Sequence, residues 1–169
     1  MPTRQYRIRL CGKVMNMLNA ELVELHGIEP GWRFGLSFDV RWSELDAFAH
    51  VSHRSYFTWC EEARNAYFAS LGEPAFSVDA AGPVLKDVGF TYERSLDQSS
   101  QVVVTARVAW VRNTSFRMEF AAWSRELVGR GHAICIWMRN STGELVALPD
   151  DLRCRIAQRD EPQDLRGVK

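Results

Sequence analysis

The sequence contains one long run with helical periodicity, HRSYFTWCEEARNAYFASL at His53–Leu71. Its apolar residues recur at helical spacing and form one stripe: Tyr56, Cys60, Ala63 and Tyr67. At the α-helical rise such a helix would be about 30 Å long, which is enough to cross a whole sheet. Gly72 follows the run and Pro74 lies beyond it, so we expect the helix to end there.

On both sides of this run the hydrophobic period changes to two, which is typical of strands. We expect one strand before the helix, Arg33–Trp42, and four after it: Val84–Arg94, Gln101–Val111, Ser115–Ser124 and Val128–Arg139. The links between the later strands are too short for helical crossovers, so we expect these strands to pair as antiparallel neighbours. A single long helix must then cover the apolar face of the sheet. The element order predicts an α+β hotdog fold, an antiparallel sheet wrapped around one long central helix.

The chain has 169 residues, which suits one globular domain with short extensions. We expect the hotdog domain over residues 33–150, an N-terminal extension over residues 1–32 and a polar C-terminal tail over residues 151–169. The extension contains an amphipathic stretch at residues 14–26 that predicts a short helix. We expect this helix to pack on the outer face of the sheet or on a neighbouring subunit.

The composition excludes several classes of partner. Lys and Arg number 21 and Asp and Glu also number 21, and this zero net charge argues against a nucleic-acid partner. No apolar run approaches the length that crosses a membrane, so we expect no membrane partner. The four cysteines, Cys11, Cys60, Cys135 and Cys154, show no disulfide or metal-binding spacing, and no apolar leader follows the N-terminal arginines. These features predict a reduced, cytoplasmic protein.

The segment just before the long helix carries two carboxylates, Glu44 and Asp46. A helix N-terminus has unpaired N–H groups and a positive dipole end. A carboxylate there suits acyl transfer, in which it acts as base or nucleophile while the N–H groups hold the developing oxyanion. The alternative is that both carboxylates are loop residues that accept backbone hydrogen bonds. The spacing alone leaves both interpretations open.

The pattern in this region is Val40-Arg41-x-x-Glu44-x-Asp46-x-x-Ala49-His50-Val51, followed by Tyr56 and Glu61-Glu62-Ala63-Arg64. It resembles the 4-hydroxybenzoyl-CoA thioesterase family, and the resemblance extends over about residues 34–139. Members of that family are hotdog homodimers or homotetramers that hydrolyse acyl-CoA thioesters without a metal. The resemblance implies that this chain hydrolyses an acyl-CoA or acyl-carrier-protein thioester, as a homodimer or homotetramer, with no cofactor and no metal.

The resemblance also implies roles for individual residues. Asp46 would be the catalytic carboxylate, either attacking the thioester carbonyl or activating a water molecule. The backbone N–H of His53 would contact the substrate carbonyl oxygen, with His50 and Ser52 beside it in the substrate-binding site. Glu61 and Glu62 on the long helix are secondary carboxylate candidates.

The sequence departs from the family pattern at two places. Ala49 replaces a glycine, and because alanine needs an unstrained backbone we expect the path of the loop to shift slightly. Ser52-His53 replaces two asparagines, and the Ser52 hydroxyl is a suitable helix cap. His50 and His53 are three residues apart and lie close to Asp46, but the segment offers no third well-spaced metal ligand and no cysteine, so a metal site is not expected.

The chain has no phosphate-binding loop motif, so CoA recognition would depend on surface arginines. The candidates lie at strand ends or outward positions: Arg94, Arg112, Arg117, Arg125 and Arg139. They could instead keep the sheet soluble. One tryptophan in each of three strands, Trp110, Trp123 and Trp137, could line an acyl tunnel or belong to packed cores.

Two other functions fit a hotdog chain. One is an enoyl-thioester hydratase or dehydratase that would use Asp46 and His50, although these residues do not have the Asp-x-Asn-Pro-x-His spacing of that branch. The other is a module that binds acyl-CoA without catalysis.

Overall fold

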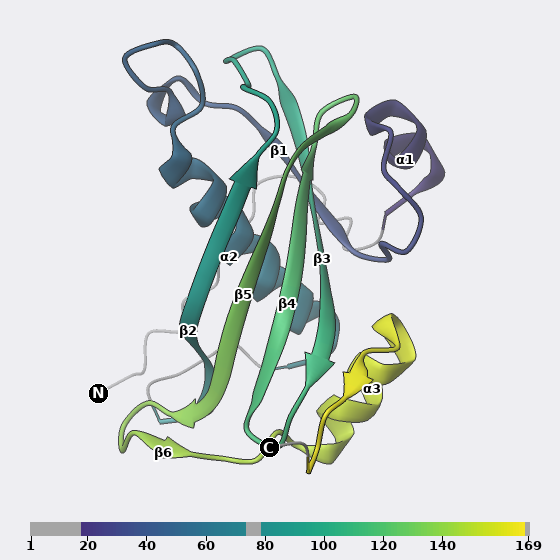
Figure 1. Ribbon diagram of the computed structural model, residues 1–169, viewed down its shortest axis with the longest axis vertical. Coiled ribbons are helices and arrows are strands. Elements are labelled where there is room, and N and C mark those ends of the chain that lie inside the picture. Colours follow the sequence, from purple (N-terminus) through teal and green to yellow (C-terminus); the bar gives the residue numbers. More distant parts are fainter. Residues whose placement is uncertain (1–17, 74–78, 168–169) are drawn as a thin grey trace, which may run out of the picture.

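The computed structural model describes residues 18–73 and 79–167. Its main strands are β1 (Gly35–Asp39), β2 (Ala81–Tyr92), β3 (Gln101–Val111), β4 (Ser115–Trp123) and β5 (Leu127–Arg139). They form an antiparallel sheet in the order β1-β3-β4-β5-β2. The helix α2 (His53–Ser70) crosses behind this sheet in Figure 1. The expected hotdog fold is therefore confirmed, and most element bounds agree with the prediction within a few residues.

The strand order differs from the expected pairing of consecutive strands in one respect. β2 pairs with β5 and not with β3, whose free side is taken by β1. The connection from β2 to β3 does not form a hairpin, because its carbonyls accept hydrogen bonds from Val40 and Val51 on the first half of the chain. These bonds join Val40 N to Ser100 O at 3.2 Å and Val51 N to Leu96 O at 2.8 Å.

The main core lies between α2 and the inner face of the sheet. The apolar stripe of α2 is buried there as predicted, and Ala63 and Tyr67 have no exposed surface. Aromatic rings meet edge to face across this core, for example Phe34 with Tyr67 and Phe68 with Phe116. Such contacts hold α2 in a fixed position along the sheet.

The N-terminal helix α1 (Ala20–His26) packs on the outer face of the sheet, beside its upper end in Figure 1. It begins later than expected: residues 14–17 lie outside the described residues, and residues 18 and 19 are not helical. Asn19 caps it, because the Asn19 side-chain oxygen accepts a hydrogen bond of 2.7 Å from Leu22 N. Under α1, Trp123 is buried with Val103 in a second small core.

The C-terminal region, which was expected to be a polar tail, contains a helix and a short strand. Residues Asp150–Asp160 form a helix, α3, and Gln163–Asp164 form a short strand, β7, that pairs with the end of β3. Leu152 and Ile156 have no exposed surface, because they join the main core where α3 packs beside β3. Two apolar residues four positions apart therefore dock a helix whose other residues are mostly polar.

Two short elements link the larger ones. The 3-10 helix η1 (Trp42–Glu44) lies between β1 and α2, and the strand β6 (Glu144–Leu145) pairs with the end of β5. No helix in the described part of the chain has the length and apolar character needed to span a membrane.

Candidate active site

The Asp46 loop lies between η1 and α2, at the upper end of the molecule in Figure 1. Leu45 and Val51 pair as a β-bridge and close the loop. Asp46 Oδ1 accepts hydrogen bonds from the backbone N–H groups of Phe48 (2.8 Å) and His50 (3.2 Å). Asp46 Oδ2 accepts none from any residue that the structure describes. One carboxylate oxygen therefore holds the loop together, and the other is available to a ligand.

Glu44 attaches this loop to the long helix. Its Oε1 accepts a hydrogen bond of 3.0 Å from the indole N–H of the buried Trp59, and its Oε2 accepts one of 2.8 Å from Arg41 N. The Glu44 carbonyl also accepts from Ser52 N at 2.8 Å and from Ser55 Oγ at 3.2 Å. All of these contacts position the loop, so Glu44 has the structural role that was one alternative for both carboxylates.

The backbone at Ala49 is strained, contrary to the expectation that the loop would shift to an unstrained path. Its φ is +61°, in the left-handed region that favours glycine, so the loop keeps a glycine-type path with an alanine in it. For an L-residue with a Cβ atom this conformation costs about 1–2 kcal/mol. The hydrogen bonds to Asp46 on either side hold the strained turn in place.

The N-terminus of α2 carries open hydrogen-bond donors. Ser52 occupies the N-cap position, but contrary to expectation its side chain makes no capping hydrogen bond. Ser55 N donates to Ser52 O at 2.9 Å, whereas the backbone N–H groups of His53 and Arg54 meet no acceptor among the described residues. These two groups lie in the first turn of the helix, where they are able to bind an anionic oxygen.

The other predicted site residues occupy separate positions. The His50 and His53 side chains are exposed, as is Glu62. Glu61 forms an ion pair of 3.2 Å with Arg64. In the described residues, no group of three or more His, Cys, Asp or Glu side chains has the geometry to hold a metal ion.

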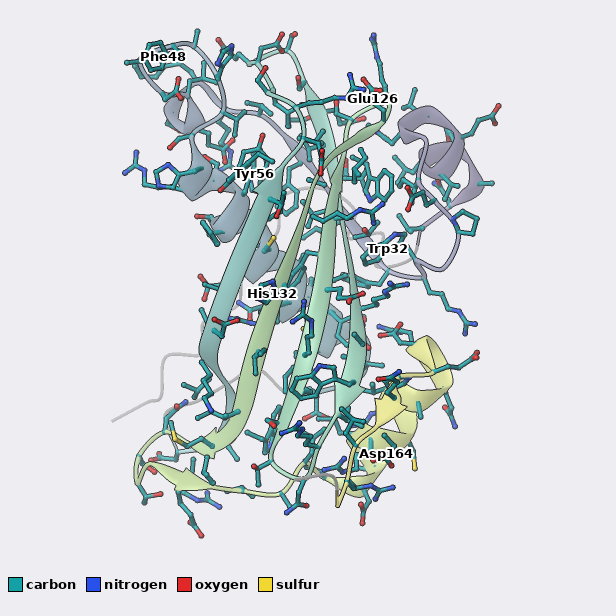
Figure 2. All side chains as sticks on the ribbon, in the orientation of Figure 1. Trp32, Phe48, Tyr56, Glu126, His132 and Asp164 are labelled. Carbon is teal, nitrogen blue, oxygen red and sulfur yellow. The ribbon has the colours of Figure 1, made fainter. Side chains whose placement is uncertain are left out.

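Two large aromatic side chains beside the Asp46 loop are exposed. Phe48 is 81% exposed and Trp42 is 76% exposed. Figure 2 shows Phe48 at the outer end of the molecule, beyond Tyr56 of α2. Exposed aromatic residues of this size are typical of surfaces that contact a ligand or another chain.

The arginines proposed for CoA phosphates do not form one cluster. Arg94 pairs with Glu126 at 2.7 Å and Arg125 N donates to His26, both near the Asp46 end. The other three lie elsewhere on the sheet: Arg112 after β3, Arg117 on β4 and Arg139 at the end of β5. The structure brings only Arg94 and Arg125 to the end of the sheet that holds Asp46.

The three tryptophans also lie apart. Trp137 packs in the main core near Phe68 and Phe116. Trp123 lies under α1, where its indole N–H donates to Thr105 Oγ1 at 3.0 Å, and Trp110 packs beside Arg112. Trp123 and Trp137 belong to two different cores and Trp110 to neither, which argues against a shared acyl tunnel.

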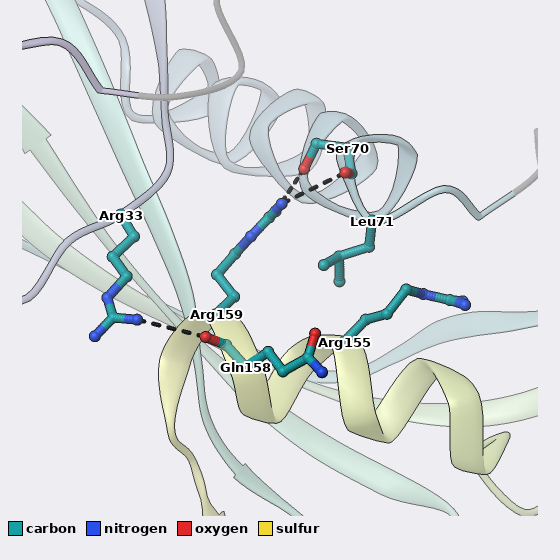
Figure 3. A pocket seen from close by; sticks show the side chains of 6 residues that line it. All are labelled: Arg33, Ser70, Leu71, Arg155, Gln158 and Arg159. Atoms are coloured by element: carbon teal, nitrogen blue, oxygen red, sulfur yellow. Dashed lines mark hydrogen bonds between the residues drawn. The ribbon is translucent and has the colours of Figure 1, made fainter.

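A cluster of arginines that sequence analysis missed lies at the other end of α2. Figure 3 shows Arg33, Arg155 and Arg159 around a cleft of about 390 Å³ between α2 and α3. Arg33 forms an ion pair with Glu161, and Arg155 forms ion pairs with Glu73 and Asp151. These carboxylates largely balance the positive charge of the cleft. The cluster could not be found in the sequence because it depends on α3, which was expected to be a tail.

A second pocket of about 270 Å³ lies along the middle of α2, between this helix and the sheet. Its wall combines residues of α2 with apolar residues of three strands: Phe57, Thr58, Cys60, Glu61, Arg64, Leu85, Val88, Phe120 and Ala133. Burial raises the pKa of the Cys60 thiol to about 12, and burial also raises the pKa of Cys135. Both thiols are therefore neutral near pH 7.

Comparison with known proteins places this geometry in context. The sequence profile of the thioesterase-like superfamily matches residues 40–156, a range that includes the Asp46 loop, α2, strands β2 to β6 and most of α3. A thioesterase superfamily protein from Jannaschia sp. CCS1 is 31% identical, with a TM-score of 0.79, over 89% of this chain and 98% of that chain.

More distant structures share the fold. A thioesterase from Thermus thermophilus, solved with coenzyme A and Zn, is 23% identical with a TM-score of 0.68, over 79% of this chain and 98% of its own. A gentisyl-coenzyme A thioesterase is 19% identical with a TM-score of 0.67, over 73% of this chain and 99% of its own. No curated protein matches the chain.

Proposed function

Because the chain belongs to the thioesterase-like superfamily, we propose that it hydrolyses an acyl-CoA or acyl-carrier-protein thioester to a free carboxylic acid and a thiol. The observation that carries this proposal is the Asp46 carboxylate, held through Oδ1 by two loop amides while Oδ2 is unpaired within the described residues. The superfamily membership agrees with the resemblance that the Asp46 motif indicated.

In the proposed reaction, Asp46 Oδ2 takes a proton from a water molecule while the water oxygen adds to the thioester carbonyl carbon. The carbon–sulfur bond then breaks, and the departing thiolate takes up the proton. In the second route, Oδ2 itself adds to the carbonyl carbon and expels the thiolate, and water hydrolyses the resulting mixed anhydride. Both routes put negative charge on the carbonyl oxygen, which the His53 and Arg54 amides at the start of α2 can stabilise.

We also propose that the working protein is a cytoplasmic homodimer or homotetramer with the site between subunits. β2 is an edge strand with one side unpaired among the described strands, and its Leu85 and Val88 side chains are 45% and 42% exposed. Phe48 and Trp42 beside the Asp46 loop are exposed as well, and a second subunit would cover such large apolar side chains. Sedimentation at micromolar concentration tests this, and a purely monomeric species would contradict it.

The test of function is thioester cleavage, measured as free thiol released from a panel of aliphatic and aromatic acyl-CoA substrates. We expect Asp46→Asn to reduce kcat by at least about 100-fold while the far-UV circular dichroism spectrum stays the same. The matched control is Asp150→Asn, an exposed aspartate at the start of α3, which should retain activity.

The outcomes separate the candidate functions. Release that persists unchanged in Asp46→Asn contradicts the role of Asp46, and the Glu61→Gln and Glu62→Gln variants then locate the carboxylate that acts instead. Binding of acyl-CoA without release by the native protein contradicts the thioesterase proposal and favours the non-catalytic binding module.

A further inference from the structure

The pocket along α2 contains a buried cation, Arg64, whose ion-pair partner, Glu61, is largely exposed. The Arg64 side chain is 10% exposed, lines the pocket and reaches from α2 to Cys135 on β5. Arginine keeps its charge in proteins, so this guanidinium carries a full positive charge in a largely apolar environment. A buried charge of this kind needs hydrogen-bond acceptors and a counter-ion.

Few acceptors reach the Arg64 guanidinium. Nη2 donates to Glu61 Oε1 at 3.2 Å, and Nη1 lies 4.0 Å from Cys135 Sγ, a weak acceptor. Nε is buried and has no hydrogen-bond partner among the described residues. Since guanidinium has five N–H donors, most of them have no strong acceptor in the described part of the chain.

Glu61 is a poor counter-ion for this charge. Its side chain is 63% exposed, and an ion pair with a largely solvated partner contributes little to stability. The Cys60 and Cys135 thiols stay neutral near pH 7 because burial raises the pKa of each. Glu61 and Arg64 both line the pocket, so its inner end holds one largely exposed carboxylate and one buried guanidinium with donors that are unpaired in the described structure. The rest of the wall is mostly apolar and includes Phe57, Leu85 and Phe120.

The pocket is aligned with the proposed catalytic site. Phe57 and Arg64 lie four and eleven residues after His53 on the same helix, which places them about 6 Å and about 16 Å along its axis. An acyl group whose carbonyl lies at the start of α2 and whose chain follows the helix would therefore bring its far end to Arg64.

We propose that this pocket binds the acyl group and that Arg64 binds a carboxylate at its far end, so that the preferred substrates are ω-carboxyacyl thioesters. This inference deepens the proposed thioesterase function and rests on it. The apolar wall would contact the methylene chain, while the carboxylate would supply acceptors for the Arg64 donors that Glu61 leaves unpaired. Hydrogen bonds to a charged group of this type contribute roughly 1.5–3 kcal/mol, which corresponds to a preference of about 10- to 100-fold.

The experiment compares substrates of equal length that differ only at the far end: adipoyl-CoA with hexanoyl-CoA, suberoyl-CoA with octanoyl-CoA, and sebacoyl-CoA with decanoyl-CoA. The readout is the ratio of kcat/KM for the carboxylated and the methyl-ended member of each pair. We expect the ratio to exceed 1 by about 10-fold or more for at least one chain length in the native protein. Arg64→Met should reduce that ratio by about 10-fold or more, and Arg64→Lys should retain part of it.

The ratio is internal to each variant, so a general loss of folded protein does not change it. Met matches the aliphatic stem of Arg, and because Glu61 is 63% exposed, its carboxylate is solvated when the guanidinium is removed. Arg130→Met is the matched control, because Arg130 is exposed on β5 and lies outside the pocket; its ratio should equal that of the native protein.

The possible failures are distinguishable. If methyl-ended substrates are hydrolysed as well as carboxylated ones at every length, or if Arg64→Met changes both members of a pair equally, the inference is wrong and the thioesterase function stands. Equal changes accompanied by a shift in oligomeric state would identify Arg64 as a structural or interface residue. If no thioester is hydrolysed by the native protein, the proposed function and the inference are both wrong.

Discussion

The Tyr67 hydroxyl donates a hydrogen bond of 2.6 Å to Asp160 Oδ2, which joins the end of α2 to the last residue of α3. The same carboxylate oxygen accepts a second hydrogen bond of 2.7 Å from Val108 N on β3. One carboxylate therefore connects the central helix, the C-terminal helix and the sheet. This contact explains why a mostly polar segment folds against the hotdog core.

Removing the Tyr67 hydroxyl should destabilise the protein. In Tyr67→Phe the ring keeps its contacts in the core, but the half-buried Asp160 carboxylate loses one donor, and we expect a loss of about 1–3 kcal/mol in the free energy of unfolding. Urea unfolding followed by tryptophan fluorescence measures this. The control is Tyr92→Phe, because the Tyr92 side chain is 44% exposed and its hydroxyl makes no hydrogen bond in the described structure. Equal effects of the two substitutions would contradict the assigned role.

Asp160 should also make stability depend on pH. Burial raises the pKa of Asp160 above its ordinary 3.8, although the hydrogen bonds from Tyr67 and Val108 oppose this shift. The folded state therefore binds a proton more readily than the unfolded state, so the contribution of Asp160 to stability is greatest at low pH and decreases as the pH rises from about 3.8 through the raised pKa. Relative to Asp160→Asn, the native protein should lose stability across that window and change no further above it. A difference between the two urea midpoints that stays constant with pH would contradict this prediction.

Glycine at position 49 should stabilise the Asp46 loop. Ala49 has a φ of +61°, and Ala49→Gly relieves this strain at the smaller cost of a more flexible unfolded chain. We expect a gain of about 0.5–1 kcal/mol in the free energy of unfolding. Ala47→Gly in the same exposed loop has no positive φ to relieve and should lose stability instead. Thermal unfolding of both variants provides the comparison, and equal shifts would show that the strain is not stored at Ala49.

Much of the fold could be predicted because local pattern and tertiary contact agree. The stripe from Tyr56 to Tyr67 is buried along its whole length, so the sequence period identified α2 correctly. The order of the strands could not be predicted in the same way. Periodicity identifies a strand but not its neighbour, and here the backbone hydrogen bonds to Leu96 and Ser100 decide that β2 and β3 separate.

The residues of the candidate site could be predicted from the sequence, but their contacts could not. The motif located Asp46 and the start of α2, yet both interpretations of the two carboxylates hold in part, since Asp46 Oδ1 binds loop amides and Glu44 positions the loop. In the sequence, Arg64 is only the last residue of the motif Glu61-Glu62-Ala63-Arg64. Its burial and its missing acceptors depend on Cys135, a residue 71 positions away, so no local pattern could reveal them.

The cysteines should differ sharply in reactivity. Only the thiolate reacts rapidly with disulfide reagents, and burial raises the pKa of Cys60 to about 12 and raises that of Cys135, whereas Cys154 is exposed. In a Cys11→Ser background at pH 8, we expect one thiol to react with dithiobisnitrobenzoate in the folded protein and two more after denaturation. Adding Cys154→Ser should remove the fast phase, and a fast phase that remains would contradict the burial of the other two.

The contact between Glu44 and Trp59 should matter for both stability and catalysis. Glu44→Ala leaves the Trp59 indole N–H, in a side chain that is 1% exposed, without its acceptor, and it also removes the acceptor of Arg41 N. We expect a loss of about 1–3 kcal/mol in the free energy of unfolding, measured in urea. Because the same contact sets the distance from the Asp46 loop to α2, we also expect kcat for the best acyl-CoA substrate to decrease by about 10-fold or more.

Trp59→Phe separates these two effects. It removes the indole donor but keeps an aromatic ring beside Phe38 and Tyr56. In a double-mutant cycle, the Glu44→Ala and Trp59→Phe effects on stability should be less than additive, because either substitution removes the same hydrogen bond. Glu44→Ala should reduce kcat more than Trp59→Phe, since only Glu44 also holds Arg41. If Glu44→Ala leaves kcat unchanged while stability falls, the Asp46 loop keeps its catalytic position without Glu44, and its own turn, closed by the Asp46 Oδ1 hydrogen bonds, is sufficient.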